Sequence, residues 1–157
     1  MLKKVSRLTP SRVRGRFAIV ASLYNRRYVD AMVNAANRTL KGSGSDVEVI
    51  RVPGAFEIPA VAARLAAGGT LDALICLGVI LRGATTHAEH VGQAVTSALV
   101  WLQVKHQLPV IHEVLLLENE TQARERCLSP RHNRGIEAAQ TALSMAATMR
   151  RLRKPAV

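Results

Sequence analysis

Hydrophobic and polar positions along this chain follow two patterns that alternate from one end to the other. Short apolar runs, rich in Val, Ile and Leu, are bounded by turn-forming Gly, Pro and Asn residues, which is typical of strands buried on both faces of a sheet. The run ALICLGVIL at 73–81 is nearly continuous and predicts a central strand. Together the runs predict strands at 16–22, 47–52, 73–81 and 110–117.

Between and after these strands, apolar residues recur every three or four positions, which is the spacing of an amphipathic helix. Helices are predicted at 28–41, 58–67, 87–107, 119–127 and 133–151. The buried stripe of the first helix is predicted to be Val29, Met32, Val33, Ala36 and Leu40. That of the last helix is predicted to be Ile136, Ala139, Leu143 and Ala147.

Strands that alternate with helices predict an α/β fold in one domain spanning residues 1–157. We expect a flavodoxin-like three-layer sandwich with a four-stranded, mainly parallel sheet. In such a sheet, ligands bind outside the carboxyl ends of the strands. The segments that follow Ser22, Val52, Leu81 and Leu117 are therefore where a site is predicted.

The charge distribution separates the two ends of the chain from its body. The formal net charge is +11, yet the first sixteen residues hold six Lys or Arg, the last eight hold four, and neither stretch holds an acid. We therefore treat 1–15 as a basic N-terminal arm and 150–157 as a basic C-terminal tail. The nearly neutral body argues against a nucleic-acid groove, so nucleic acid is expected to bind only non-specifically, through these ends.

Composition excludes several classes of protein. The chain has 157 residues, of which 48% are hydrophobic and 21% charged, a balance typical of a folded domain. No apolar run reaches the ~18 residues of a membrane span, and no apolar signal segment follows the basic start, so a cytoplasmic location is expected. A short transit peptide is the alternative interpretation of that start. Cys76 and Cys127 form no C-x-x-C motif that would indicate a zinc or disulfide site.

The predicted strand ends carry a chemically coherent set of side chains. Tyr24 follows the first strand, Glu57 the second and His87 the third, while Arg126 lies beyond the fourth. The loop 83–86 opens a helix, whose unpaired N–H groups can bind a phosphate. Together these groups could recognise a planar polar ring and a phosphate.

Each of these residues also has a purely structural interpretation. Glu57 could serve only to favour a helix dipole, and Arg126 could be a solvated helix residue. His87 and His90 are three apart, a spacing that could ligate a metal, but no third ligand lies at a natural spacing and no metal is expected. The loop 83–86 is not a P-loop, because Ala84 stands where the P-loop has Lys.

Four motifs in order give the chain a family resemblance. They are V-P-G-A-F-E-I-P at 52–59, G-V-I-L-R-G-A-T-T-H at 78–87, N-x-x-Q-A-x-x-R at 119–126 and N-R-G-x-E-A-A at 133–139. With them, residues from about 8 to 153 resemble the 6,7-dimethyl-8-ribityllumazine synthases of riboflavin biosynthesis. The resemblance implies a transferase that joins 5-amino-6-(D-ribitylamino)uracil to 3,4-dihydroxy-2-butanone 4-phosphate, releasing phosphate and water. It implies no cofactor and no metal.

The resemblance also assigns roles to individual residues. His87 matches the proton-transfer residue of the family. The pyrimidine and its ribityl chain would contact Tyr24, Ala55, Phe56, Glu57, Val79, Ile80, Leu81 and His112. The phosphate would contact Ala84, Thr85 and Arg126.

The chain departs from the family pattern at three places. His112 stands where members usually have Phe, so the second ring contact would be an imidazole. Ala88 and Glu89 replace a Phe-Asp pair, which keeps an acid near His87. Arg134 stands where many members have Lys. Glu89 and Arg134 are therefore further candidates for the site.

Family members assemble as pentamers, decamers or sixty-subunit shells with active sites shared between neighbours. By this resemblance His112 and Arg126 would come from the adjacent subunit, and a homopentamer is the smallest functional unit expected. Riboflavin synthase is a candidate protein partner. Two alternatives are a catalytically silent shell protein and a basic-armed nucleic-acid-binding protein on the same fold.

Overall fold

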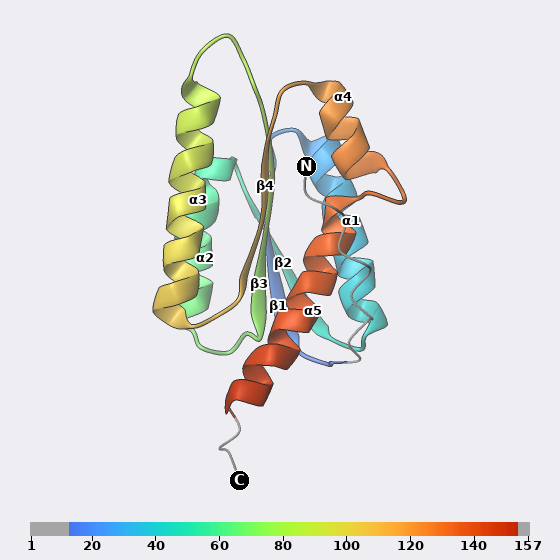
Figure 1. Ribbon diagram of the computed structural model, residues 1–157, viewed down its shortest axis with the longest axis vertical. Helices are drawn as coiled ribbons and strands as arrows, with labels where there is room; N and C mark the ends of the chain where they lie inside the picture. Colours follow the sequence, from blue (N-terminus) through green and yellow to red (C-terminus); the bar gives the residue numbers. More distant parts are fainter. Residues whose placement is uncertain (1–12, 154–157) are drawn as a thin grey trace.

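The computed structural model describes residues 13–153, in which one sheet separates two layers of helices (Figure 1). The strands are β1 (Arg16–Ser22), β2 (Asp46–Val52), β3 (Ala73–Leu81) and β4 (Val110–Leu117). The α-helices are α1 (Arg26–Gly42), α2 (Ile58–Ala67), α3 (His87–His106), α4 (Glu120–Ala123) and α5 (Arg134–Arg153). The predicted α/β three-layer architecture is confirmed. Basic residues before Val13, and Lys154, lie outside the described part.

The strands lie in the order β2-β1-β3-β4, and all three pairings are parallel. The described sheet is thus wholly parallel, where the sequence predicted a mainly parallel one. Its order matches the first four strands of the flavodoxin arrangement. All four strands point the same way, so their carboxyl ends meet at one edge.

Helices α2 and α3 cover one face of the sheet, and α1, α4 and α5 cover the other (Figure 1). Alternate residues of β1 and β3 pack into the two resulting cores, which is why residues 17–21 of β1 and all of β3 carry no polar side chain. The predicted stripe of α1 is buried at all five positions. The sheet is therefore held on both faces, and only its edges and strand ends are open to partners.

The rotation of α5 about its axis differs from the prediction. Ala139 and Leu143 are buried as expected, but Ile136 and Ala147 are only half-buried. A close approach between backbones sets the rotation, because a Cβ on Gly135 would lie 2.1 Å from the carbonyl oxygen of Met32 in α1. The side of α5 that meets α1 and the sheet instead buries Ala138, Ala142 and Ala146.

The predicted helix at 119–127 is two short pieces. Asn119 begins α4 by accepting the backbone N–H of Gln122 at 3.0 Å, an N-cap interaction. From Arg124 to Leu128 the backbone widens into a π-helical turn. Single π turns of this kind are frequent at functional sites.

Parts of the predicted arm and tail pack onto the domain. Arg14 donates from Nε to the carbonyl of Gly44, and the tail begins as the last turn of α5. There Arg150 forms an ion pair with Asp72 at 2.9 Å. Burial raises the pKa of Asp72, but hydrogen bonds from Arg150 and from the N–H of Arg16 outweigh it and lower that pKa overall. No helix within residues 13–153 is long and apolar enough to cross a membrane.

Candidate active site

The ends of β1 and β2 are joined by backbone hydrogen bonds. Leu23 donates to the carbonyl of Val52 at 2.8 Å, and Tyr24 donates to that of Pro53 at 3.2 Å. A Cβ on Gly54 would lie 3.4 Å from the ring of Tyr24 and 2.8 Å from a carboxylate oxygen of Glu57. The glycine therefore lets the aromatic ring and the carboxylate come close together, as the V-P-G-A-F-E motif requires.

Asn25 connects this pair of strand ends to a third. Its backbone is left-handed, with φ of 55°, and its side-chain amide donates to the carbonyl of Val79 at 2.7 Å. Asn tolerates this conformation better than most residues do. Sequence reasoning did not single out Asn25, although an Asn directly after a buried strand was the available signal.

The pyrimidine candidates of one subunit form a surface with two exposed rings. Tyr24 is 73% exposed and Phe56 63% exposed, which is unusual for aromatic side chains. Ala55 and Val79 are buried, while Ile80 and Leu81 are half-buried. The exposed rings are thus available to a ligand.

The loop after β3 places His87 at the first position of α3. Ala84, Thr85 and His87 are all exposed, and the N–H of His87 donates to the hydroxyl of Thr85 at 3.4 Å. The amino end of a helix carries partial positive charge. This end of α3 therefore offers an anion both backbone donors and an adjacent imidazole.

Glu89, the acid that follows His87 in the sequence, pairs with Arg82 and not with His87. It forms an ion pair with Arg82, whose Nε also contacts Glu118 at 2.8 Å. These contacts join the start of α3 to the ends of β3 and β4. The second carboxylate oxygen of Glu89 is buried without a hydrogen-bond partner in the described residues.

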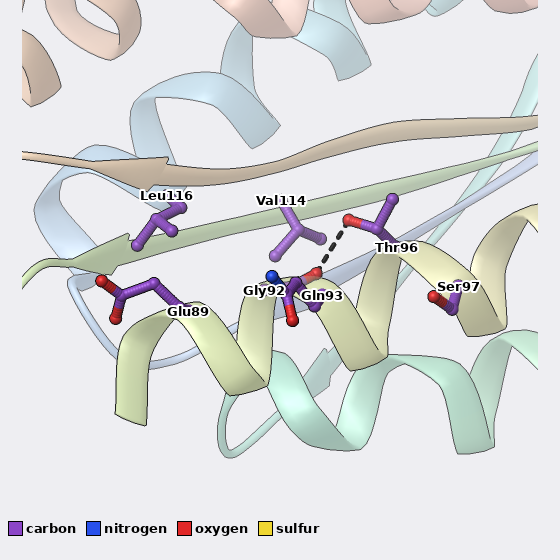
Figure 2. A pocket seen from close by; sticks show the side chains of 7 residues that line it. All are labelled: Glu89, Gly92, Gln93, Thr96, Ser97, Val114 and Leu116. Atoms are coloured by element: carbon purple, nitrogen blue, oxygen red, sulfur yellow. Dashed lines mark hydrogen bonds between the residues drawn. The ribbon is translucent and has the colours of Figure 1, made fainter. Parts of the chain in front are cut away.

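A groove between α3 and β4 continues from Glu89 (Figure 2). It is lined by Glu89, Gly92, Gln93, Thr96, Ser97, Val114 and Leu116. In Figure 2 the hydroxyl of Thr96 reaches the backbone of Gly92, a bond of 2.8 Å. No sequence motif pointed to this groove.

His112 is held beside this groove by two defined hydrogen bonds. Its Nδ1 accepts the backbone N–H of Val114 at 3.1 Å, and its Nε2 lies 2.7 Å from the hydroxyl oxygen of Thr96. Since Nδ1 is an acceptor and the Thr96 hydroxyl already donates to Gly92, the ring must carry its proton on Nε2. Burial lowers the pKa of His112, which favours this neutral form.

Arg126 and Arg134 lie on the opposite face of the sheet from His87. Arg126 is exposed on the π-helical turn, which packs against α1 and α5, and its side chain has no hydrogen-bond or ion-pair partner within residues 13–153. Arg134 instead donates two hydrogen bonds to the carboxylate of Glu113, from Nε to Oε2 and from Nη2 to Oε1, both at 3.0 Å. One chain thus brings Tyr24, Glu57 and the β3 end together, and it leaves His112 and Arg126 on other surfaces.

The sequence of this chain matches known proteins of one family. The family model described as 6,7-dimethyl-8-ribityllumazine synthase matches residues 14–150. A protein of that name from Stenotrophomonas maltophilia strain R551-3 is 42% identical over 133 residues, which cover 83% of this chain and 86% of that protein. One from Xanthomonas campestris pv. campestris strain B100 is 41% identical over the same shares of each chain.

The chain belongs to the 6,7-dimethyl-8-ribityllumazine synthase family. The lumazine synthase match includes every candidate residue from Tyr24 to Arg134 and both helical layers. The predicted family and fold class are confirmed.

Proposed function

We propose that this chain catalyses the condensation of 5-amino-6-(D-ribitylamino)uracil with 3,4-dihydroxy-2-butanone 4-phosphate to 6,7-dimethyl-8-ribityllumazine. The observation that carries the proposal is the lumazine synthase match over residues 14–150. The reaction is a transferase step of riboflavin biosynthesis. It proceeds by imine formation, loss of phosphate, ring closure and loss of water, with no change of redox state.

Three strand ends would bind the pyrimidine. The exposed face of Tyr24 would stack on the ring, since its ring already lies against Gly54 and leaves its other side to solvent. Glu57, next to it, would accept hydrogen bonds from the ribityl hydroxyls. Phe56 and the backbone of Val79, Ile80 and Leu81 would complete the pocket.

The amino end of α3 would bind the phosphate of the second substrate. The backbone N–H groups of Ala84 and Thr85 and the guanidinium of Arg126 would share its negative charge. His87, one helical position beyond this loop, would transfer protons during imine formation and phosphate loss. The remainder of the rate acceleration would come from holding the two substrates in the correct relative orientation.

The site requires an assembly of several copies, because Arg126 and His87 lie on opposite faces of the sheet in one chain. The family assembles as oligomers, and we propose a homopentamer in which His112 and Arg126 reach the neighbouring subunit's site. An uncovered apolar strip on α3 supports this, because Val100, Trp101 and Val104 are each more than half exposed. Pentamers could assemble further, and riboflavin synthase is the proposed protein partner.

A fluorescence assay of lumazine formation on both purified substrates tests the function. Product formation that needs both substrates supports the proposal, and a correctly assembled protein that forms none overturns it in favour of a silent shell protein. Sedimentation of the same sample tests the pentamer, with a monomer or dimer of full activity as the contradicting result.

A further inference from the structure

Glu113 is a buried carboxylate that the reaction described above does not use. Its residue is only 7% exposed, on a strand that is otherwise apolar apart from His112. Burial raises the pKa of Glu113, and the guanidinium of Arg134 opposes this shift. A buried charge is costly unless it is paired, so the ion pair with Arg134 favours the ionised form of Glu113.

Arg134 forms ion pairs with two carboxylates. Nε and Nη2 form a parallel fork on Glu113, while Nη1 forms an ion pair with Glu137. Burial lowers the pKa of Arg134, but the charge of Glu113 outweighs it and raises that pKa overall. Every nitrogen of the guanidinium therefore already faces a carboxylate.

The local backbone fixes this arrangement. The side-chain oxygen of Asn133 accepts the N–H of Gly135 at 2.8 Å, and its amide donates to the carbonyls of Cys127 and Ala31. Asn133 thereby ties the start of α5, which carries Arg134, to the π-helical turn, which carries Arg126. The turn that carries Arg126 is thereby held next to the helix start that carries Arg134.

Arg126 directly precedes Cys127, whose carbonyl is bound by the Asn133 that adjoins Arg134, and the charge of Arg126 also lowers the pKa of Glu113. Unlike Arg134, it has no hydrogen-bond or ion-pair partner among residues 13–153. A single buried carboxylate thus lies in the field of two arginines, of which Arg134 is paired with carboxylates and Arg126 is available. A dianion that approaches Arg126 would be repelled by Glu113 if Arg134 did not neutralise it.

We propose that Glu113 and Arg134 are positioning residues that set the charge around Arg126, and that Arg134 does not itself bind the substrate phosphate. The inference rests on the proposed function, since it concerns the phosphate site of that reaction. Arg134 cancels the charge of Glu113, and Arg126 remains the arginine that meets the phosphate. The substitution of Arg for the family's Lys is thereby matched by a carboxylate that engages it.

The test is a double-mutant cycle at Glu113 and Arg134. The two measured quantities are the KM for the butanone phosphate and the inhibition constant of inorganic phosphate. Glu113→Gln removes a negative charge and should lower that KM roughly threefold to tenfold. Arg134→Gln exposes the charge of Glu113 and should raise it by a similar factor. The double variant should return close to the wild-type KM, and the KM for the pyrimidine should stay constant throughout.

Other outcomes overturn the inference. If the double variant keeps the raised KM of Arg134→Gln, Arg134 contacts the phosphate itself. If no KM changes while the melting temperatures fall, the pair only stabilises the fold. Arg150→Gln is the matched control, because it breaks an ion pair at the far end of the same helix and should leave both KM values unchanged.

Two further measurements keep the result decisive. Should the buried single variants not fold, Glu137→Gln removes the exposed partner of Arg134 and should still lower the KM for the phosphate substrate, and an unchanged KM overturns the inference. Calorimetric titration of the assembled wild type and the same variants with inorganic phosphate measures the effect of each substitution on phosphate affinity without turnover. A wild-type protein that binds phosphate but forms no lumazine would contradict the proposed function alone.

Discussion

Arg82 pairs with Glu89 across the start of α3, two residues beyond the exposed imidazole of His87. The acid of this motif is therefore engaged in joining α3 to the ends of β3 and β4. His87 has no side-chain hydrogen bond to it, so the proton transfer that we propose for His87 would rely on its imidazole ring alone. The two residues can be separated by experiment.

We predict that His87→Ala lowers turnover while Glu89→Gln changes it little. Positioned acid–base groups contribute about 10²–10⁴-fold, and we expect the low end, because an aryl amine and a ketone condense readily once aligned. The measurement is kcat for lumazine formation in assembled protein. Equal losses in both variants would show that Glu89 acts on the reaction through His87.

Arg126→Ala should raise the KM for the butanone phosphate and leave that for the pyrimidine nearly constant. Loss of a charge-assisted hydrogen bond costs roughly 1.5–3 kcal/mol, or about 10- to 150-fold in KM. Arg124→Ala is the control, since it removes another exposed arginine that already pairs with Glu120. A change confined to the pyrimidine KM would mean that the two subsites are assigned the wrong way round.

His112 should make stability depend on pH. Burial lowers its pKa, so the unfolded chain binds a proton at a higher pH than the folded one. Its contribution is present above pH ~6.5 and is lost as the pH falls through the lowered pKa, because protonation of Nδ1 removes the acceptor of the Val114 N–H.

The comparison for this prediction is His112→Phe, which carries the usual family aromatic and cannot titrate. The free energy of unfolding of the wild type minus that of the variant, measured at equal protein concentration, should fall from pH 8 to pH 5. A difference that stays constant would show that the imidazole is not held neutral.

Gly135→Ala should destabilise the fold by about 1–3 kcal/mol, the usual cost of overpacking. The added Cβ would lie 2.1 Å from the carbonyl oxygen of Met32, so α5 must move away from α1. Gly42→Ala, where nothing lies within 4 Å, should instead be neutral or stabilise by up to about 1 kcal/mol. Thermal unfolding of both variants decides the matter, and similar melting temperatures would refute the close contact.

Deletion of residues 1–7 and 154–157 should retain lumazine formation per site while weakening association with polyanions. The deletion removes Lys3, Lys4, Arg7 and Lys154, all outside the described residues, and in a pentamer about twenty charges are lost. The measurement is the amount of nucleic acid bound to the full-length and the truncated protein at low and at high salt. Loss of activity in an intact assembly would mean that an end of the chain reaches the site.

The sequence predicted most of the fold because each strand is marked by its own residues. The bounds of β1, β3, β4 and α2 agree with the prediction, since Gly, Pro and Asn residues flank continuous apolar runs. The rotation of α5 was not predictable in the same way. Its alanines lie on several sides of the helix, so hydrophobicity offers little contrast, and the backbone contact of Gly135 decides the buried side.

The site was predicted as a set of residues but not as a set of contacts. Tyr24, Glu57 and His87 follow strand ends, and parallel strands bring such ends together. The pairing of Glu113 with Arg134 spans 21 positions and depends on how α5 crosses β4. The bond from His112 to Thr96 depends likewise on how α3 lies on the sheet. Local pattern carries no information about either.

Adjacent positions of β4 serve two unrelated networks, His112 toward α3 and Glu113 toward α5. Loss or gain of one residue within the strand would exchange its faces and send the imidazole and the carboxylate to the wrong layers. Evolution can therefore change the chemistry of β4 by substitution, but the contacts with α3 on one face and with α5 on the other both constrain the length of the strand. Changes of length must accumulate in the flanking loops, and a protein engineer can vary either face of this strand independently.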